Sequence, residues 1–285
     1  MSSNYASPLR YPGGKGKLGH WLGELMRFNK ISDGSYVEPY AGGAGAALYL
    51  LFSGYVNHII INDADTAIYG MWHSILHNTS DFLYKLEDTP VNIESWDRQK
   101  NIINNPDSYS LLDLGFAAFF LNRTNISGVI KGGVIGGREQ KGNYKIDARF
   151  NKAELARRIR HIAGHKNNID VYNCDAMDFL NKINENLPPK SMIYFDPPYY
   201  QKGSQLYRNY YRHDDHVAIA GKIKNINRPW LVTYDNCEQI KNLYNDCPGG
   251  KFNLIYTAGL KNRGRTTELM FYGNMQLKKF PVLTA

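Results

Sequence analysis

The sequence has few cysteines and no long apolar run. Its 285 residues include three cysteines, which form no C-x-x-C pair and no disulfide framework, as is typical of a reducing compartment. The longest nearly apolar run covers the eight residues 114–121, whereas a membrane-spanning helix needs about 20. The first 17 residues lack the apolar core of a secretory signal. We therefore expect a cytoplasmic protein without a membrane partner.

Metal-ligand patterns and internal repeats are also missing. The histidine pairs His73/His77 and His161/His165 have a spacing that places both rings on one face of a helix. Neither pair has a third ligand patterned nearby, and a zinc site usually needs three or four protein ligands. We therefore expect no metal.

The charge is distributed unevenly. The chain has 34 Lys and Arg against 26 Asp and Glu, and its net charge of +8 favours an anionic partner. Residues 123–166 hold eleven Lys and Arg but three acidic residues, so this stretch carries the whole excess and the rest is balanced. The 21 tyrosines suit base stacking between basic side chains. Nucleic acid is the favoured partner, and a solvated basic face is the alternative.

Apolar segments at intervals predict an α/β sheet. Residues 35–38 and 57–61 have strand patterns on either side of a glycine-rich turn and a helix at 46–52, which is half of a parallel sheet. Further strands are predicted at residues 169–172, 191–195, 230–234, 252–256 and 268–272. We predict a discontinuous α/β domain at residues 1–65 and 165–285, interrupted by a mostly helical insertion at residues 66–164.

The strongest motif follows the predicted strand at residues 191–195. Asp196 ends this strand at the edge where open α/β sheets bind ligands. Pro197 and Pro198 stiffen the chain and donate no N–H group. A planar amine can donate one hydrogen to the Asp196 carboxylate and the other to the Pro197 carbonyl, while the ring of Tyr199 stacks on the heterocycle. We predict that these four residues form the catalytic pocket.

A glycine-rich turn follows the first predicted strand. The segment E-P-Y-A-G-G-A-G at residues 38–45 contains Gly42, Gly43 and Gly45, where the backbone can approach a ligand closely. Asp63, at the end of the second strand, suits a pair of ribose hydroxyls. The third glycine of a dinucleotide fingerprint is absent, which favours a nucleoside cofactor without pyrophosphate. A plain tight turn is the alternative.

A second glycine-rich loop, Y-P-G-G-K at residues 11–15, lies near the start of the sequence. Its spacing does not match a phosphate-binding P-loop. Lys15 can pair with a carboxylate and Tyr11 can stack on a purine, whereas a solvated glycine loop is the alternative.

Four motifs in this order resemble the Dam-type DNA adenine methyltransferases. They are Y-P-G-G-K at 11–15, E-P-Y-A-G-G-A-G at 38–45, N-D at 62–63 and D-P-P-Y at 196–199. The segment L-N-R-T-N-I-S-G at 121–128 is also similar to that family's L-N-R-x-x-x-[SN]-G segment. The resemblance implies a Rossmann-like class I methyltransferase mixed sheet with an inserted DNA-recognition domain. It also implies S-adenosylmethionine as the cofactor and S-adenosylhomocysteine as its product.

The resemblance also implies site residues. Asp63 would bind the ribose, and Asp175 follows the strand where relatives contact the cofactor's adenine. The implied cofactor-binding residues are Tyr11, Lys15, Glu38, Pro39, Tyr40, Gly42, Gly43, Gly45, Asp63, Asp175 and Asp196. The expected DNA-binding residues, from the basic insertion and the run after D-P-P-Y, are Arg123, Asn125, Ser127, Lys131, Arg138, Lys141, Lys145, Tyr207 and Arg208.

The implied reaction is methyl transfer to the exocyclic N-6 amine of an adenine flipped out of double-stranded DNA. One alternative is a methyltransferase of the same fold that acts on RNA or a protein amide. Another is a catalytically silent DNA-binding relative. We expect a monomer, and a cognate restriction or defence partner is not visible in the sequence. The departure from relatives in the glycine-rich stretch after residue 127 means that GATC specificity is not assumed.

Overall fold

A seven-stranded sheet forms the centre of the computed structural model, which describes residues 7–10, 15–183, 186–201, 203, 210–255 and 265–281. The strands are β1 (Ser35–Glu38), β2 (His58–Asn62), β3 (Ile169–Tyr172), β4 (Ser191–Phe195), β5 (Trp230–Asp235), β6 (Gly249–Ile255) and β7 (Arg265–Gly273). Their order is β3-β2-β1-β4-β5-β7-β6; the first five are parallel and β7 is antiparallel to both its neighbours. This is the arrangement of the class I methyltransferase sheet, so the predicted fold is confirmed.

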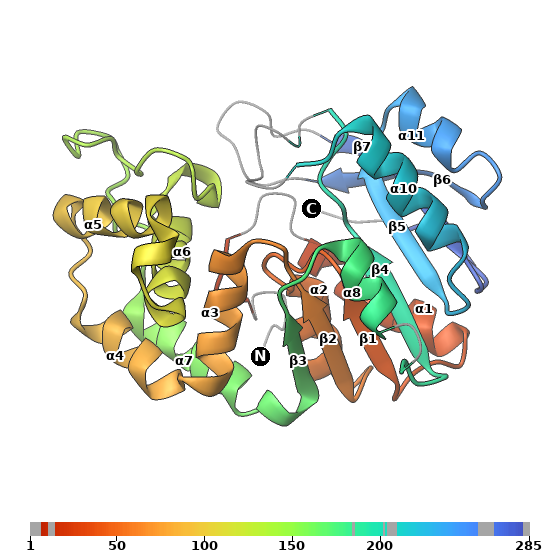
Figure 1. Cartoon of the computed structure of the whole chain (residues 1–285), viewed down its shortest axis with the longest axis horizontal. Coiled ribbons are helices and arrows are strands. Elements are labelled where there is room, and N and C mark those ends of the chain that lie inside the picture. The colour runs from red at the N-terminus through yellow and green to blue at the C-terminus, as the bar shows by residue number, and fades with distance from the viewer. Residues whose placement is uncertain are drawn as a thin grey trace.

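Helices cover both faces of the sheet (Figure 1). Alternate residues of each strand point to opposite faces, so Tyr36 of β1 packs against α1 (Gly19–Phe28) and α2 (Gly45–Phe52) in one core cluster. Its neighbour Val37 belongs to the second cluster. That cluster includes α8 (Ala176–Ile183), α10 (His213–Lys224) and α11 (Glu238–Leu243), the last of which the sequence did not predict. Both faces are therefore buried, which explains the nearly continuous apolar strands.

Five further helices lie between β2 and β3 in the chain. They are α3 (Thr66–His77), α4 (Thr79–Asp88), α5 (Ile93–Asn104), α6 (Leu111–Thr124) and α7 (Lys152–Ala163). Figure 1 shows α4, α5 and α6 beyond α3, to one side of the sheet. A Cβ atom on Gly115 of α6 would lie 2.3 Å from the Gly70 backbone of α3, so these two helices pack with their backbones in close contact. Since α3 directly follows β2, this contact attaches the helical group to the sheet.

The glycine-rich stretch between α6 and α7 is a loop rather than a regular hairpin. Its pairing with the end of α6 is an isolated antiparallel bridge between Asn125 and Val134. Within the described ranges, no helix is both long enough and apolar enough to cross a bilayer.

Candidate active site

The carboxyl ends of β1 and β4 meet at the centre of the sheet. The chain continues from β1 to β2 on one side and from β4 to β5 on the other, so the strand order reverses between these two neighbours. Such a switch point is where open α/β sheets bind ligands. Glu38 ends β1 and Asp196 follows β4, which places both predicted acidic residues at this edge.

The Asp196 carboxylate is held in a polar network. Thr233 Oγ1 of β5 donates a hydrogen bond to Asp196 Oδ1 at 3.0 Å, and Lys15 Nζ pairs with the same oxygen at 3.1 Å. Burial raises the pKa of Asp196, whereas the Lys15 ammonium lowers it. The side chain is still 22% exposed, so this fixed acceptor remains accessible at the sheet edge. Pro197 and Pro198 behind it are buried.

Tyr199 and Lys15 meet at a carboxylate that the sequence analysis missed. Tyr199 Oη donates to Glu268 Oε1 of β7 at 2.8 Å, and Lys15 Nζ lies 3.2 Å from Glu268 Oε2. Lys15 Nζ also donates to Tyr199 Oη at 3.2 Å. The predicted pocket thus includes one further residue, Glu268, from an antiparallel strand that is far away in sequence. For that position the sequence predicted only a strand, from the pattern E-L-M-F.

The chain after Tyr199 is anchored by a second unpredicted acid. Asp235, the last residue of β5, accepts hydrogen bonds from the backbone N–H groups of Tyr200 at 2.8 Å and Gln201 at 2.9 Å. A carboxylate that accepts two backbone N–H groups forms charge-assisted bonds. The segment that follows D-P-P-Y is therefore tied to the strand beside β4.

The N-D pair at the end of β2 connects three loops. The buried side chain of Asn62 donates to the Pro39 carbonyl at 3.0 Å and to the Cys174 carbonyl at 3.1 Å. Asp63 accepts from the N–H groups of Gly42 and Asp65, both at 2.9 Å. Burial raises the pKa of Asp63 to about 7. Asn62 thus fixes the loops that follow β1 and β3 on either side of the Asp63 carboxylate.

The glycine-rich turn brings backbone segments together at the start of α2. A Cβ atom on Gly45 would lie 3.2 Å from the Cα of Gly16, so a side chain there would crowd the loop that carries Lys15. Ala44 takes a left-handed conformation with φ of 45°, which aims the N-terminus of α2 at the sheet edge. Helix N-termini attract carboxylates and other anions.

Glu38 and Asp175 each accept a backbone hydrogen bond at the start of a helix, α2 and α8 respectively. Glu38 Oε1 accepts from the Ala47 N–H at 3.2 Å, and burial raises the pKa of Glu38 to about 8. The exposed Asp175 accepts from the Met177 N–H at 2.8 Å at the start of α8. The N-terminus of α2, the Asp63 carboxylate and the acidic loop at Asp175 together fit a nucleoside cofactor that carries an amino-acid tail.

The motifs and their geometry agree with a family comparison. The sequence model of one protein family, the D12 class N6 adenine-specific DNA methyltransferases, matches residues 11–262 of the chain. The chain belongs to this family. A search of curated proteins returned no match.

Solved structures resemble this D12-class chain only distantly. An S-adenosylmethionine-dependent methyltransferase from Agrobacterium tumefaciens is 12% identical over 91% of the chain, with a TM-score of 0.43. A protein assigned to the class I S-adenosylmethionine-dependent methyltransferases, from Listeria monocytogenes, is 12% identical over 93% of the chain, with a TM-score of 0.38. The D12-class chain spans 62% of the length of each of these two proteins.

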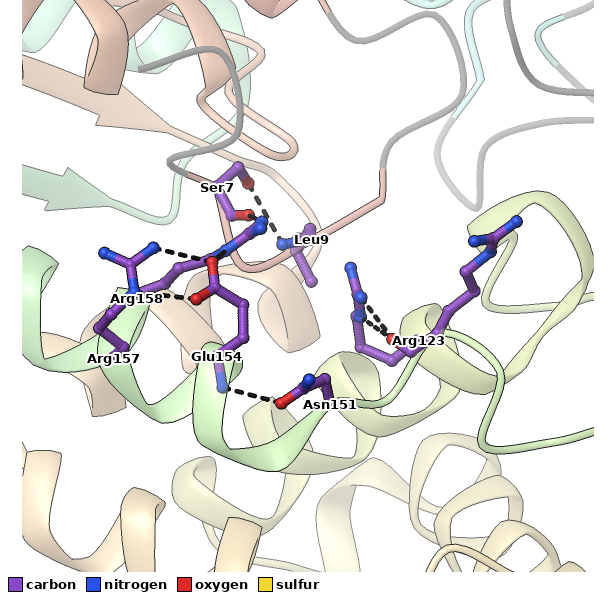
Figure 2. Close-up of polar contacts among 8 residues, drawn as sticks. Ser7, Leu9, Arg123, Asn151, Glu154, Arg157 and Arg158 are labelled. Carbon is purple, nitrogen blue, oxygen red and sulfur yellow. Dashed lines mark hydrogen bonds and ion pairs between the residues drawn. The ribbon is translucent and has the colours of Figure 1, made fainter. Parts of the chain in front are cut away.

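Four arginines gather between α6, α7 and the N-terminal segment of this D12-class chain. Arg123 Nε donates to the Arg149 carbonyl at 2.7 Å, and Arg158 Nη1 donates to the Ser7 carbonyl at 3.1 Å (Figure 2). Burial, together with the charges of Arg10, Arg158 and Arg149, lowers the pKa of Arg123 to about 9. In the described part of the chain, no acidic side chain lies within ion-pair distance of Arg123 or Arg149. Arg158 pairs with Glu154 at 2.8 Å, so the excess positive charge of the cluster comes from Arg10, Arg123 and Arg149.

The structure separates the other predicted DNA-binding residues into two groups. Asn125 is buried; its amide donates to the Val129 and Ile130 carbonyls at 2.9 Å, and its oxygen accepts from Trp96 Nε1. Asn125 therefore holds the turn after α6 in this structure and is not placed to contact DNA directly. The second group lies at the surface of the 127–145 loop, where Ser127 is half-buried and the exposed members are Lys131, Arg138, Lys141 and Lys145.

Two further predicted site residues, Arg138 and Tyr40, are bound by other side chains of the protein. Arg138 forms a bidentate ion pair with Asp97 of α5, at 2.6 and 2.9 Å, which orients its guanidinium over the surface. The half-buried Tyr40 shares a 2.9 Å hydrogen bond with the Tyr211 hydroxyl. The predicted contacts at Tyr11, Tyr207 and Arg208 lie outside the described residues.

Asn122 was also missed, although it belongs to the L-N-R segment. Its buried side chain accepts from the Arg10 N–H at 2.7 Å and donates to the Arg10 and Gly128 carbonyls, each at 2.9 Å. A Cβ atom on Gly128 would lie 2.1 Å from the Arg10 carbonyl oxygen, so only glycine fits there. This clamp fixes the N-terminal segment, five residues before Lys15, to the end of α6.

Proposed function

We propose that this D12-class chain transfers a methyl group from S-adenosylmethionine to the N-6 amine of an adenine that is flipped out of duplex DNA. The observation that carries this proposal is Asp196, a partly exposed carboxylate at the end of β4, with Pro197 and Tyr199 immediately after it. The family match supports the adenine amine as the target group. The cradle around Asp63 and the start of α2 suits the cofactor.

The pocket residues have distinct tasks in this proposal. Asp196 and the Pro197 carbonyl accept the two hydrogens of the amine, which favours a tetrahedral nitrogen with a directed lone pair. The Asp196 carboxylate stabilises the positive charge that develops on this nitrogen and receives the proton that the nitrogen then loses. Tyr199 stacks on the base and fixes its plane. The cofactor, when bound, supplies the electrophilic methyl group, and the two sites together fix the approach of the reactants.

The helical insertion is proposed as the target-recognition domain, at residues 66–164. The local charge excess of residues 123–166 and the arginine cluster around Arg123 support this assignment. We propose that Arg123 and Arg149 contact a phosphodiester of the DNA backbone, and that exposed loop residues such as Lys131 and Arg138 approach the bases. Cytoplasmic location and a monomeric state stay predictions.

The test is transfer of labelled methyl from S-adenosylmethionine to duplex DNA, followed by base analysis. The expected product is N-6 methyladenine. Replacement of Asp196 by alanine should lower the rate about 100- to 1,000-fold, because a preorganised acceptor is lost, while DNA affinity stays within about twofold. Asp178→Ala, which removes an exposed carboxylate on α8, is the matched control. Labelled cytosine, labelled RNA alone, or full activity of Asp196→Ala would refute the assignment.

A further inference from the structure

Glu268 is a deeply buried carboxylate beside the proposed target-base pocket. It lies on β7, where it pairs in register with Asp235 of β5, the strand next to β4. Its side chain is 1% exposed. Burial of an ionised carboxylate is unfavourable unless an opposite charge and hydrogen bonds offset the loss of hydration. Apolar residues would suit a β-strand position of this kind, so the acid calls for an explanation at the site.

The contacts of Glu268 connect two pocket residues. Its Oε1 accepts a hydrogen bond from Tyr199 Oη at 2.8 Å, and its Oε2 forms an ion pair with Lys15 Nζ at 3.2 Å. Lys15 in turn donates to the Tyr199 hydroxyl at 3.2 Å, so the three groups form a closed triangle. The phenol oxygen is held from two sides, which fixes the far end of the aromatic ring.

Lys15 is also shared between two carboxylates. Its Nζ lies 3.1 Å from Asp196 Oδ1 and 3.2 Å from Glu268 Oε2. The ammonium therefore does not have to follow Asp196 when that carboxylate exchanges partners, because Glu268 and the Tyr199 hydroxyl hold it in place. The Lys15 Nζ also lies 5.3 Å from the centre of the Tyr199 ring.

We propose that Glu268 is a positioning residue, which fixes the Tyr199 ring for stacking on the target base and keeps Lys15 beside Asp196. This inference rests on the proposed function. Glu268 acts through the hydroxyl of Tyr199 and the ammonium of Lys15. Displacement of a positioning group by about 1 Å can lower a rate about 100-fold, which is the scale expected here.

The experiment compares wild type with Glu268→Gln and Glu268→Ala. Glutamine keeps the shape and a carbonyl acceptor but loses the charge that holds Lys15, whereas alanine loses both contacts. Glu238→Gln, on the exposed α11 surface, is the matched control because its side chain is 76% exposed. The readouts are kcat, KM for DNA, the cofactor dissociation constant, and fluorescence of 2-aminopurine at the target position. Stacking on Tyr199 quenches that probe.

We expect Glu268→Ala to lower kcat about 100-fold and Glu268→Gln about 10-fold, with cofactor affinity within about twofold. The 2-aminopurine signal should become brighter in both variants, because the ring no longer holds the stacked position. Glu238→Gln should behave as wild type. A merely structural role would lower thermal stability and reduce all activities together without a brighter probe, and this result would overturn the inference.

A double-mutant cycle with Tyr199→Phe tests the route of action. Phenylalanine keeps the ring and removes the hydroxyl that Glu268 holds. The combined variant should lose at least twofold less activity than the product of the two single losses, since the two changes break the same contact. Independent, multiplying losses would overturn the inference. If wild type labels no adenine, the proposed function fails together with this inference; an active wild type with unaffected Glu268 variants refutes this inference alone.

Discussion

Replacement of Glu38 by glutamine should change the pH dependence of stability. Glu38 ends β1, is 5% exposed, and accepts one hydrogen bond from the Ala47 N–H. Burial, together with the nearby Asp196 charge, raises its pKa from 4.5 to about 8, so the folded chain favours the protonated form. Glutamine keeps a carbonyl oxygen for the Ala47 N–H and has no proton to lose.

The size of the effect follows from proton linkage. Between pH 4.5 and about 8 the folded state holds a proton on Glu38 that the unfolded state has lost, so wild-type stability falls as the pH rises through this window. The slope approaches about 1.4 kcal/mol per pH unit. From about pH 5.5 to about pH 8.5, wild type should therefore lose about 3 kcal/mol more free energy of unfolding than Glu38→Gln.

Urea unfolding at about pH 5.5, 7.0 and 8.5 measures this difference, with equal m-values as the condition for comparison. Glu94→Gln is the control, because the Glu94 side chain is 81% exposed on α5. Its curve should run parallel to wild type, whereas the Glu38→Gln curve should fall less steeply. Parallel curves for wild type and Glu38→Gln would refute the reasoning, since they would mean that Glu38 is ionised in the folded state.

Two further predictions concern ligand binding. Asp63→Ala should weaken S-adenosylmethionine binding roughly 10- to 100-fold in a calorimetric titration, because hydrogen bonds to a charged acceptor are lost. Since the pKa of Asp63 is about 7, the affinity of wild type for the cofactor should also fall as the pH drops below that value. Arg123→Gln should lower the slope of log affinity for DNA against log salt by about 0.9, the loss of one phosphate contact. Arg27→Gln on α1 is the control for Arg123→Gln. An unchanged cofactor affinity of Asp63→Ala would contradict the assignment of Asp63 to the cofactor, and an unchanged salt slope of Arg123→Gln would contradict the assignment of Arg123 to a DNA phosphate.

Residues that lie close together in sequence could be predicted, because their geometry is local. Asp196 directly follows an apolar strand, and its place at the sheet edge follows from the direction of that strand. The turn at Gly42 and its bond to Asp63 follow the β-turn-α-β pattern in the same way. The strand order then follows from the parallel crossovers that such units require.

The remaining site residues could not be predicted, because packing between distant segments places them. Glu268 reaches Tyr199 across 69 positions only because β7 inserts beside β5. Asn125 has the composition of a DNA contact, yet its neighbours Val129, Ile130 and Trp96 take up its whole amide. A single sequence does not distinguish a polar residue that holds a turn from one that faces a ligand.

The Asn122 clamp also has a consequence for synthesis on the ribosome. Arg10 is synthesised before Asn122, which holds it and follows 112 positions later. The hydrogen bonds between Arg10 and Asn122 therefore form only after α6 has been made. Lys15 in turn pairs with Asp196 and Glu268 only after these later residues have been made. No nascent chain that ends before α6 contains an assembled active site.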